Sequence, residues 1–475
     1  MFSKDDSDIL WVKPNREKGG HGSFESPFPT ISTAIERVRP GQKIILLGGV
    51  YTTTVTFQKS GTIRHPILIT ALEGEDVRIS GACWFFYDAS DIVISRLHFT
   101  NSPHSAIAMI GKCERNRIEF VRFTNCGTDE KTACTVFFGG SKGYCNIVEG
   151  CHFEFVEERK DIQSRQTVGI LLSEGDHGDG SPNKDHILRK NSFLNYGYGI
   201  LVGSRDDTTG EYGHIVEYNF VDGCLVDGIM AKCGDTQIRG NRIQNCGRSS
   251  IAVVAGRGSV IDGNRIENSS TGIAVKGIGH TVRNNCIIDC SEQAIDLPGN
   301  KPMDKAPSKN IFIEQNTCID CGKPAGSGAV AGVRIHPDSS CIIRRNIFHG
   351  SGRPYIVGPA AGKEHTNLTR QRIVNDNISS GKCEALQGTS SSEIAFSSVS
   401  QKDYGNNSGY GASGWVLHPG LHDPDEENAS HNIQSPLSRS VSGKDLSAVD
   451  GLIDELNEQE LFQRSFLFRK RKQNK

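Results

Sequence analysis

One short pattern recurs through the middle of this chain: an apolar alternation, then an asparagine, then another apolar pair. In order along the sequence it reads HILRKNSF, HIVEYNFV, TQIRGNRI, SVIDGNRI, HTVRNNCI, IFIEQNTC and CIIRRNIF. The asparagines of these segments are Asn191, Asn219, Asn241, Asn264, Asn285, Asn316 and Asn346. Three of the steps between them are 22, 23 and 21 residues long, and the wider steps are 28 to 31 residues. A repeat of this length indicates a solenoid, in which each unit packs only on its neighbours.

The repeat predicts one particular kind of solenoid. The tightest steps match one coil of a parallel β-helix, and the wider steps fit the same coil with a loop inserted. A leucine-rich horseshoe has a similar period, but its leucine signature is absent here. An asparagine at a fixed turn can adopt the left-handed αL conformation, and its amide can hydrogen-bond to the next rung. We therefore predict an all-β, right-handed parallel β-helix of about a dozen coils.

A second strand lies between the asparagine segments, in YGILVG, DGIMAK, SIAVVA, TGIAVK, QAIDLP and AGVRIH. Side chains alternate between the two faces of a strand, so aligning these segments predicts which residues point outward. One outward row contains Leu201, Met230, Ala252, Ala274, Asp296 and Arg334, and the other contains Gly203, Lys232, Val254, Lys276, Pro298 and His336. We expect Lys232 and Lys276 to lie two coils apart in one row, roughly 10 Å from each other.

The two ends of the chain differ from the repeat. Near the N-terminus, SPFPTISTAIERVRPGQKIILLGGVY predicts an amphipathic helix followed by a strand, and such a helix would cap the open end of the stack. We predict residues 1–385 as the β-helix with its N-terminal cap. Residues 386–444 are expected to form an irregular Ser/Asn/Gly-rich segment and linker, and residues 445–475 a C-terminal helix with a basic tail.

Composition narrows the classes of function. The formal net charge of -2 argues against a nucleic-acid binder, which normally carries a basic surface. No apolar run is long enough to span a membrane. The opening residues MFSKDDSDILWVKPN lack the apolar core of a signal peptide. We therefore expect a cytoplasmic protein for the chain as it stands, or a secreted one if a leader has been removed.

The 15 cysteines are distributed as a solenoid ladder would place them. Cys126, Cys246, Cys290 and Cys321 each follow an Asn or Asp at the end of a similar step. This recurrence predicts free, buried thiols. A zinc site is not expected, because Cys318 and Cys321 have no second pair at zinc-finger spacing.

Two clusters of residues have the chemistry of a carbohydrate site. The segment NFVDGCLVDGIMAKC places Asn219, Asp227 and Lys232 on adjacent turns and strands, and Asn and Asp oxygens are ligands that suit calcium. A lysine beside a bound cation and an acidic sugar could act as a base. The basic outward residues Lys232, Lys276, Arg334 and His336, with Arg257 and Arg205 in nearby turns, form the second cluster. Such a cluster would attract a polyanionic sugar chain.

The segment from about residue 197 to 350 resembles the β-helical polysaccharide lyases that include chondroitinase B and many alginate lyases. The similarity runs through GYGILVGSRDD, HIVEYNFVDGC, DGIMAKCGDTQIRGN, SIAVVAGRGSVIDGN and TGIAVKGIGHTVRNN. The resemblance implies that calcium binds the uronate carboxylate, that a lysine removes the C5 proton and that an arginine assists the leaving oxygen. By motif position Lys232 matches the base, and Asn219 and Asp227 match metal ligands. Leu225 replaces a further acidic ligand and Val254 replaces the arginine, so that only Arg257 in the following turn could substitute.

These observations predict a carbohydrate-active enzyme that acts on an acidic, uronate-containing polysaccharide or oligosaccharide by β-elimination. The candidate catalytic residues are Lys232, Arg257, Lys276 and His336, the candidate substrate-binding residues are Arg205, Lys276, Arg334 and His336, and the candidate ligands of Ca²⁺ are Asn219 and Asp227. A glycoside hydrolase or a C5-epimerase on the same scaffold is an alternative. A β-helix that binds glycans without turning them over is another, and the missing arginine at Val254 favours it.

Overall fold

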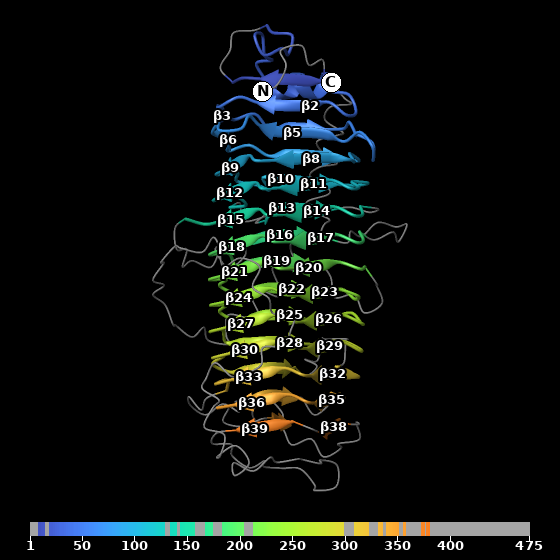
Figure 1. The fold of residues 1–475 in the computed structure, drawn as a ribbon, viewed down its shortest axis with the longest axis vertical. Coiled ribbons are helices and arrows are strands. Elements are labelled where there is room, and N and C mark those ends of the chain that lie inside the picture. Colours follow the sequence, from blue (N-terminus) through green and yellow to red (C-terminus); the bar gives the residue numbers. More distant parts are fainter. Residues whose placement is uncertain are drawn as a thin grey trace, which may run out of the picture.

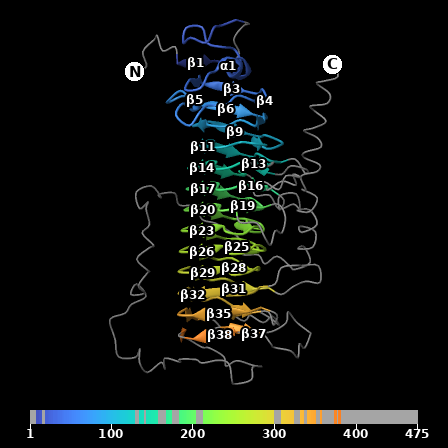
Figure 2. The same ribbon diagram turned by 90° about the vertical axis from the view of Figure 1, so that its right-hand side faces the viewer.

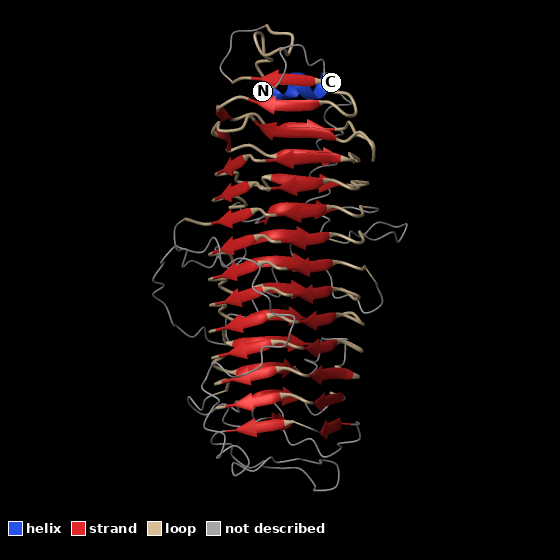
Figure 3. Ribbon diagram, in the orientation of Figure 1, coloured by secondary structure: helices blue, strands red, loops and turns tan. Residues whose placement is uncertain are grey.

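The computed structural model of the chain consists almost entirely of short parallel strands stacked in one column (Figures 1 and 3). The residues that it describes are 8–14, 19–128, 134–139, 143–156, 167–173, 183–203, 212–298, 308–322, 331–335, 339–350, 355–357, 372–375 and 377–380. In each coil the chain passes through three sheets in turn, and every strand pairs with its counterparts in the neighbouring coils. The predicted right-handed parallel β-helix is confirmed.

The three sheets are named here A, B and C. Within the described residues sheet A has 14 strands: β1 (Ile9–Val12), β2 (Lys43–Leu46), β5 (Ile67–Ala71), β8 (Ile92–Ser95), β11 (Arg117–Glu119), β14 (Ile147–Glu149), β17 (Ile187–Arg189), β20 (Ile215–Glu217), β23 (Gln237–Arg239), β26 (Val260–Asp262), β29 (Thr281–Arg283), β32 (Ile311–Glu314), β35 (Cys341–Arg344) and β38 (Arg372–Asn375). Sheet B has β3 (Gly49–Tyr51), β6 (Val77–Ser80), β9 (His98–Thr100), β12 (Arg122–Thr124), β15 (His152–Glu154), β18 (Ser192–Leu194), β21 (Phe220–Asp222), β24 (Arg242–Gln244), β27 (Arg265–Glu267), β30 (Cys286–Ile288), β33 (Thr317–Ile319), β36 (Ile347–His349) and β39 (Ile378–Ser380). Sheet C has β4 (Val55–Phe57), β7 (Trp84–Tyr87), β10 (Ile107–Ile110), β13 (Cys134–Gly139), β16 (Val168–Leu172), β19 (Tyr198–Val202), β22 (Ile229–Ala231), β25 (Ser249–Val253), β28 (Thr271–Val275), β31 (Gln293–Leu297), β34 (Ala331–Ile335) and β37 (Tyr355–Val357).

The predicted cap is the helix α1 (Ile31–Arg37), at the N-terminal end of the stack (Figure 2). Thr30 caps it, because its side-chain oxygen accepts a hydrogen bond from the backbone N–H of Thr33. The helix packs against β1 and β4 and buries Ile31, Ala34 and Ile35. It thereby covers apolar rungs that would otherwise be open to solvent. The predicted C-terminal helix and basic tail lie outside the described residues.

The asparagines of the repeat form one continuous buried ladder from Asn191 to Asn377. The Oδ1 atom of Asn241 accepts hydrogen bonds from the backbone N–H of Asn219 at 2.9 Å and from its Nδ2 at 3.0 Å. The Nδ2 of Asn241 in turn donates to the carbonyl of Val216 and to Oδ1 of Asn264. The αL conformation belongs to the residue before each asparagine from Asn191 to Asn346, with φ of 53° at Tyr218, and not to the asparagine as the sequence suggested. The amide is thereby left in the coil interior, where it pairs with both neighbours.

A second ladder runs along the turn between sheets C and A, and it contains histidines. The backbone N–H of Asn146 donates to Nδ1 of His186 at 3.2 Å, and the N–H of His186 donates to Nδ1 of His214 at 3.3 Å. Ser259 donates in the same way to Nδ1 of His280 at 3.0 Å. Because Nδ1 accepts in each case, these imidazoles are neutral and carry their proton on Nε2. All three side chains are buried.

Apolar stacks fill the interior between these ladders. Phe99, Phe123, Phe153 and Phe193 stack through four successive coils, with ring centroids 4.6 to 5.5 Å apart. The cysteines of the described residues are free thiols, and all but Cys145 are buried, as the repeat predicted. Among the described residues no helix is long and apolar enough to cross a membrane.

Candidate functional site

The predicted outward rows of sheet C are present in the structure. Register pairs Ala231 with Val253 and Val253 with Val275, so the residues that follow them occupy one row. The backbone N–H of Lys232 donates to the Val202 carbonyl at 2.7 Å, and that of Lys276 donates to the Val253 carbonyl at 2.7 Å. Lys232 and Lys276 therefore lie two coils apart in the same row, as predicted. Both are mostly buried, with 8% and 6% of their surface exposed.

The outward face of sheet C changes character along the stack. In the N-terminal and central coils it is an apolar cluster that includes Phe137, Leu171, Leu201, Met230 and Ala252. In the same row the next coils carry Ala274, then Asp296 and Arg334. The charged residues of this row, Asp296 and Arg334, therefore lie in the coils that follow that of Lys276.

Asp296 and Arg334 form a bidentate ion pair across two coils. Nε and Nη2 of Arg334 donate to Oδ1 and Oδ2 of Asp296 at 2.7 and 2.6 Å. Burial acts to lower the pKa of Arg334, but the hydrogen bonds to Asp296 outweigh it and the pKa is raised. Arg334 therefore stays charged at the sheet surface, with its side chain 31% exposed. Asp296 was predicted to point outward but was not recognised as a site residue. In the sequence, its predicted outward position beside a row of basic residues was the feature that could have identified it.

Asn219, one of the predicted metal ligands, lies inside the stack of coils. The residue is one rung of the asparagine ladder and is only 1% exposed. Its Oδ1 accepts from the backbone N–H and from Nδ2 of Asn191, both at 3.0 Å. Its Nδ2 donates to the carbonyl of Leu188 and to Oδ1 of Asn241. The amide oxygen is thus committed to the fold because the ladder needs an acceptor at every rung.

Asp227 is fully buried and is engaged by an arginine that the sequence did not single out. Oδ1 accepts from Nε of Arg248 at 2.9 Å and from the backbone N–H of Ser249 at 3.0 Å, and Oδ2 accepts from Nη2 of Arg248. The Arg248 side chain is 24% exposed. A buried carboxylate needs a partner of opposite charge, which was the signal that could have pointed to Arg248.

The contacts of Asn219 and Asp227 show whether these residues could bind a calcium ion. Calcium takes six to eight oxygen ligands, with carboxylates prominent among them. Here Asn219 is committed to the ladder, both oxygens of Asp227 face Arg248, and Leu225 offers no oxygen. No group of three or more His, Cys, Asp or Glu residues in the described part of the chain could hold a metal ion. The residues present do not fit the predicted calcium site.

Of the remaining predicted residues, Arg257 lies in the part of the chain that the structure describes. Arg257 is exposed in the turn between β25 and β26. Its backbone carbonyl accepts a hydrogen bond from the backbone N–H of Asp235, and its backbone forms an isolated parallel β-bridge with Ile278. Arg205 and His336 lie outside the described residues. Val254 stands between Lys232 and Lys276 and is partly buried, so the row has no arginine at that coil.

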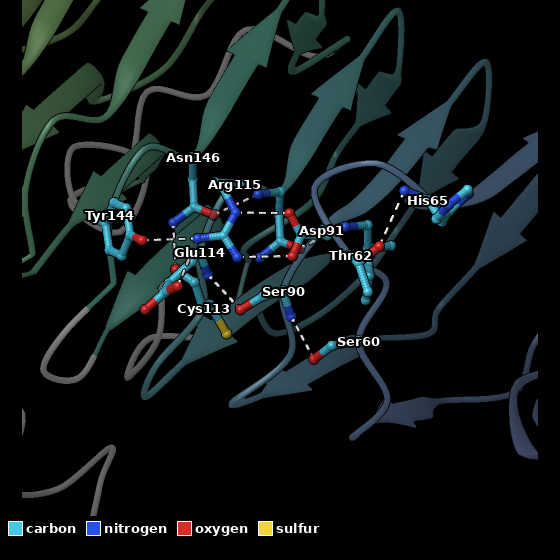
Figure 4. A network of polar contacts seen from close by, with 12 residues as sticks. Ser60, Thr62, His65, Ser90, Asp91, Cys113, Glu114, Arg115, Tyr144 and Asn146 are labelled. Carbon is cyan, nitrogen blue, oxygen red and sulfur yellow. Dashed lines mark hydrogen bonds and ion pairs between the residues drawn. The ribbon is translucent and has the colours of Figure 1, made fainter. Parts of the chain in front are cut away.

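Another charged network lies nearer the N-terminal end, at the turns between sheets C and A (Figure 4). Nε and Nη2 of Arg115 donate to Asp91, each at 2.8 Å, and Nη1 contacts Glu114 and the Tyr144 hydroxyl, also at 2.8 Å. This network links three successive coils through one guanidinium. Its carboxylates are paired, so we assign it a structural role.

Two family models match parts of the chain. Residues 168–325 match the right-handed β-helix region, and residues 278–409 match a family described as disaggregatase related. Over 74 residues the chain is 36% identical to pectate lyase PEL9 of Emericella nidulans, which is 15% of this chain and 18% of that protein. It is also 36% identical over 74 residues to the uncharacterized protein YwoF of Bacillus subtilis, covering 16% of each chain. The chain thus matches under a fifth of the length of these relatives.

Several solved structures share the fold. The PL6 family alginate lyase AlyGC superposes with a TM-score of 0.60 at 17% identity, covering 82% of this chain and 53% of that one. The PL6 family polysaccharide lyase Pedsa3628 from Pseudopedobacter saltans gives a TM-score of 0.57 at 16% identity, over 78% of this chain and 93% of that one. This chain therefore spans about half of AlyGC and nearly all of Pedsa3628. The protein is a right-handed parallel β-helix with the fold that these polysaccharide lyases also have.

Proposed function

We propose that this protein acts on acidic, uronate-containing polysaccharides or oligosaccharides, and that it cleaves them by β-elimination. The observation that carries the proposal is the position of Lys232 and Lys276 in one outward row of sheet C. The Arg334–Asp296 pair lies in the adjacent row, in the two coils that follow that of Lys276. The shared fold with PL6 lyases and the short match to a pectate lyase support the same chemistry.

The proposed reaction assigns Lys232 as the base. Its amine takes the C5 proton of the uronate, the C4–O4 bond breaks, and a C4–C5 double bond forms. The departing O4 gains a proton, for which Arg257 and His336 are the proposed donors or assisting groups. Lys276, Arg334, Arg205 and His336 are proposed to bind the sugar carboxylates, because fixed cations attract and orient an anionic chain.

Ultraviolet absorbance of the unsaturated uronate product tests this proposal. The substrates are alginate, pectate, dermatan sulfate, chondroitin sulfate and their oligosaccharides. We expect wild-type protein to produce a rising signal with at least one of them, and Lys232→Ala to reduce the rate at least about 1000-fold, since the base is lost. Lys112→Ala is the matched control, because that lysine is exposed on a turn and pairs with Glu114. Full activity in Lys232→Ala would refute the assignment of the base.

Glycan binding without turnover is the second candidate function, and Val254 favours it. This partly buried apolar residue occupies the coil between the two lysines, where the resemblance to lyases implies an arginine. If the protein binds glycans without turning them over, calorimetry detects binding of one of the same oligosaccharides while no unsaturated product forms. Release of reducing ends without unsaturated product would instead indicate a hydrolase, and a change of uronate configuration would indicate a C5-epimerase.

A further inference from the structure

Asp227 is a buried acidic residue at the start of a strand of sheet C. It precedes β22 at the position that pairs in register with Ser249 and Thr271 in the next coils. Its carboxylate is completely buried, and an ionised carboxylate in such a place is strongly destabilising unless it is paired. The pairing comes from Arg248 in the following coil, through two hydrogen bonds to its two oxygens.

We propose that the guanidinium of Arg248 is the fixed cation of this site and takes the place of a divalent metal. This inference rests on the proposed action on acidic sugars, and it concerns which group supplies positive charge to the site. Nε and Nη2 of Arg248 hold Asp227, and the side chain is 24% exposed, so the charge reaches the surface of the sheet. A planar guanidinium binds carboxylates well, and we assign Arg248 to a uronate carboxylate of the substrate.

The neighbouring oxygens are consistent with a site that has no metal. Asp222 is the next carboxylate in the same coil, and its Oδ1 and Oδ2 accept from Nδ2 of Asn245 at 2.6 Å and from Nε2 of Gln244 at 3.0 Å. Each of these carboxylates is thus held by donors of the protein itself. A calcium ion would have to displace Arg248 from Asp227, and like charges would then be brought together.

Arg248 and Lys232 belong to the same part of sheet C. Arg248 holds Asp227, and Asp227 lies five residues before Lys232 in the coil of β22. A sugar chain that lies across this coil would therefore meet the guanidinium at the start of the strand and the proposed base at its end. This arrangement predicts that the site needs no added ion for its stability or for binding an acidic sugar.

The first experiment compares thermal stability and calorimetry of the full-length wild-type protein with calcium and with EGTA. We expect a melting-temperature difference below about 1 °C and no heat of calcium binding, because nothing in the site gains from the ion. A rise of several degrees with calcium, or saturable calcium binding that Asp227→Asn abolishes, would overturn the proposal. This arm uses no substrate, so its result is independent of whether the protein proves to be a lyase.

The second experiment measures binding of alginate and polygalacturonate oligosaccharides in EGTA by calorimetry. We expect binding by wild type, and a loss of at least about tenfold in Arg248→Met, which keeps the aliphatic stem but removes the charge. Because Arg248→Met leaves the buried Asp227 without its arginine, the double variant Asp227→Asn/Arg248→Met, which removes the buried charge as well, should fold and should still bind weakly. Wild-type affinity in the folded double variant would overturn the assignment of Arg248 to the sugar carboxylate.

Arg283→Met provides the matched control. Arg283 pairs with Asp262 through Nε at 3.0 Å, but this pair lies on the outward face of sheet A and its arginine is 45% exposed. We expect this variant to keep wild-type affinity and wild-type insensitivity to calcium. If wild type binds none of the acidic oligosaccharides, the proposed function fails together with the sugar-binding role of Arg248. The calcium experiment then decides by itself whether Arg248 replaces a metal.

Discussion

Acidification from pH 7 to pH 5 should destabilise this β-helix, because three histidines of the turn ladder are buried as neutral acceptors. His186, His214 and His280 each accept a backbone N–H at Nδ1. Burial lowers the pKa of His214 to about 3 and that of His280 to about 4. Burial, and then the charge that His214 would carry, hold the pKa of His186 well below its ordinary value.

The sign of the effect follows from which state binds protons. In the unfolded chain a histidine has a pKa of about 6.5, so below that pH the unfolded state takes up protons and the folded state does not. Stability is therefore complete above about pH 6.5 and is lost as the pH falls toward the folded pKa values. For each such histidine the free energy of unfolding falls by about 1.4 kcal/mol per pH unit below about pH 6.5, which amounts to about 2 kcal/mol at pH 5. His214 and His280 together amount to roughly 4 kcal/mol, a large fraction of the stability of a typical domain, and His186 acts in the same direction.

Denaturant unfolding at pH 7 and pH 5, followed by tryptophan fluorescence, measures this loss. In His214→Asn the side chain can still accept the backbone hydrogen bond, as Asn146 does in the same ladder, but it cannot titrate. We expect the variant to lose about 2 kcal/mol less than wild type between the two pH values, whatever its absolute stability. His65→Asn, on an exposed turn, should behave as wild type. An identical pH-dependent loss in His214→Asn and wild type would refute the reasoning.

Two further predictions concern the asparagine ladder and the thiols. Asn241→Ala should lower the free energy of unfolding by about 3 kcal/mol, because it removes the acceptor of the buried Asn219 backbone N–H and the side-chain donor to the Val216 carbonyl. Asn245→Ala, which removes a partly buried contact to Asp222, should cost about 1 kcal/mol or less in the same urea titration, and equal losses in the two variants would contradict the ladder's role. Native protein treated with iodoacetamide should be labelled at Cys145 well before Cys113 and Cys151, because both are buried and burial raises the pKa of each thiol to about 12. Equal labelling of these three cysteines, measured by mass spectrometry, would show that the coils open readily.

Much of the fold could be predicted because a solenoid repeats its local rules. Each coil needs an acceptor at the same turn and an inward apolar residue at the same strand position, and both recur visibly in the sequence. The register of sheet C, and with it the common row of Lys232 and Lys276, followed from that alternation alone. The histidine ladder was not recognised, since Asn146, His186 and Ser259 fill equivalent positions with different residue types.

The candidate site was predicted less completely, because a motif gives the type of a residue and not its partners. The segment around Asn219 and Asp227 has the oxygen ligands of a calcium site when it is considered alone. The coil repeat, the capping helix and the outward row could be predicted from the residues alone, since these features depend on periodicity within one coil and its neighbours. The role of the Asn219 amide as a rung of the ladder and the pairing of Arg248 with Asp227 became visible only in the folded chain. Those pairings join residues more than 20 positions apart, and stacking of the coils is what brings their side chains into contact.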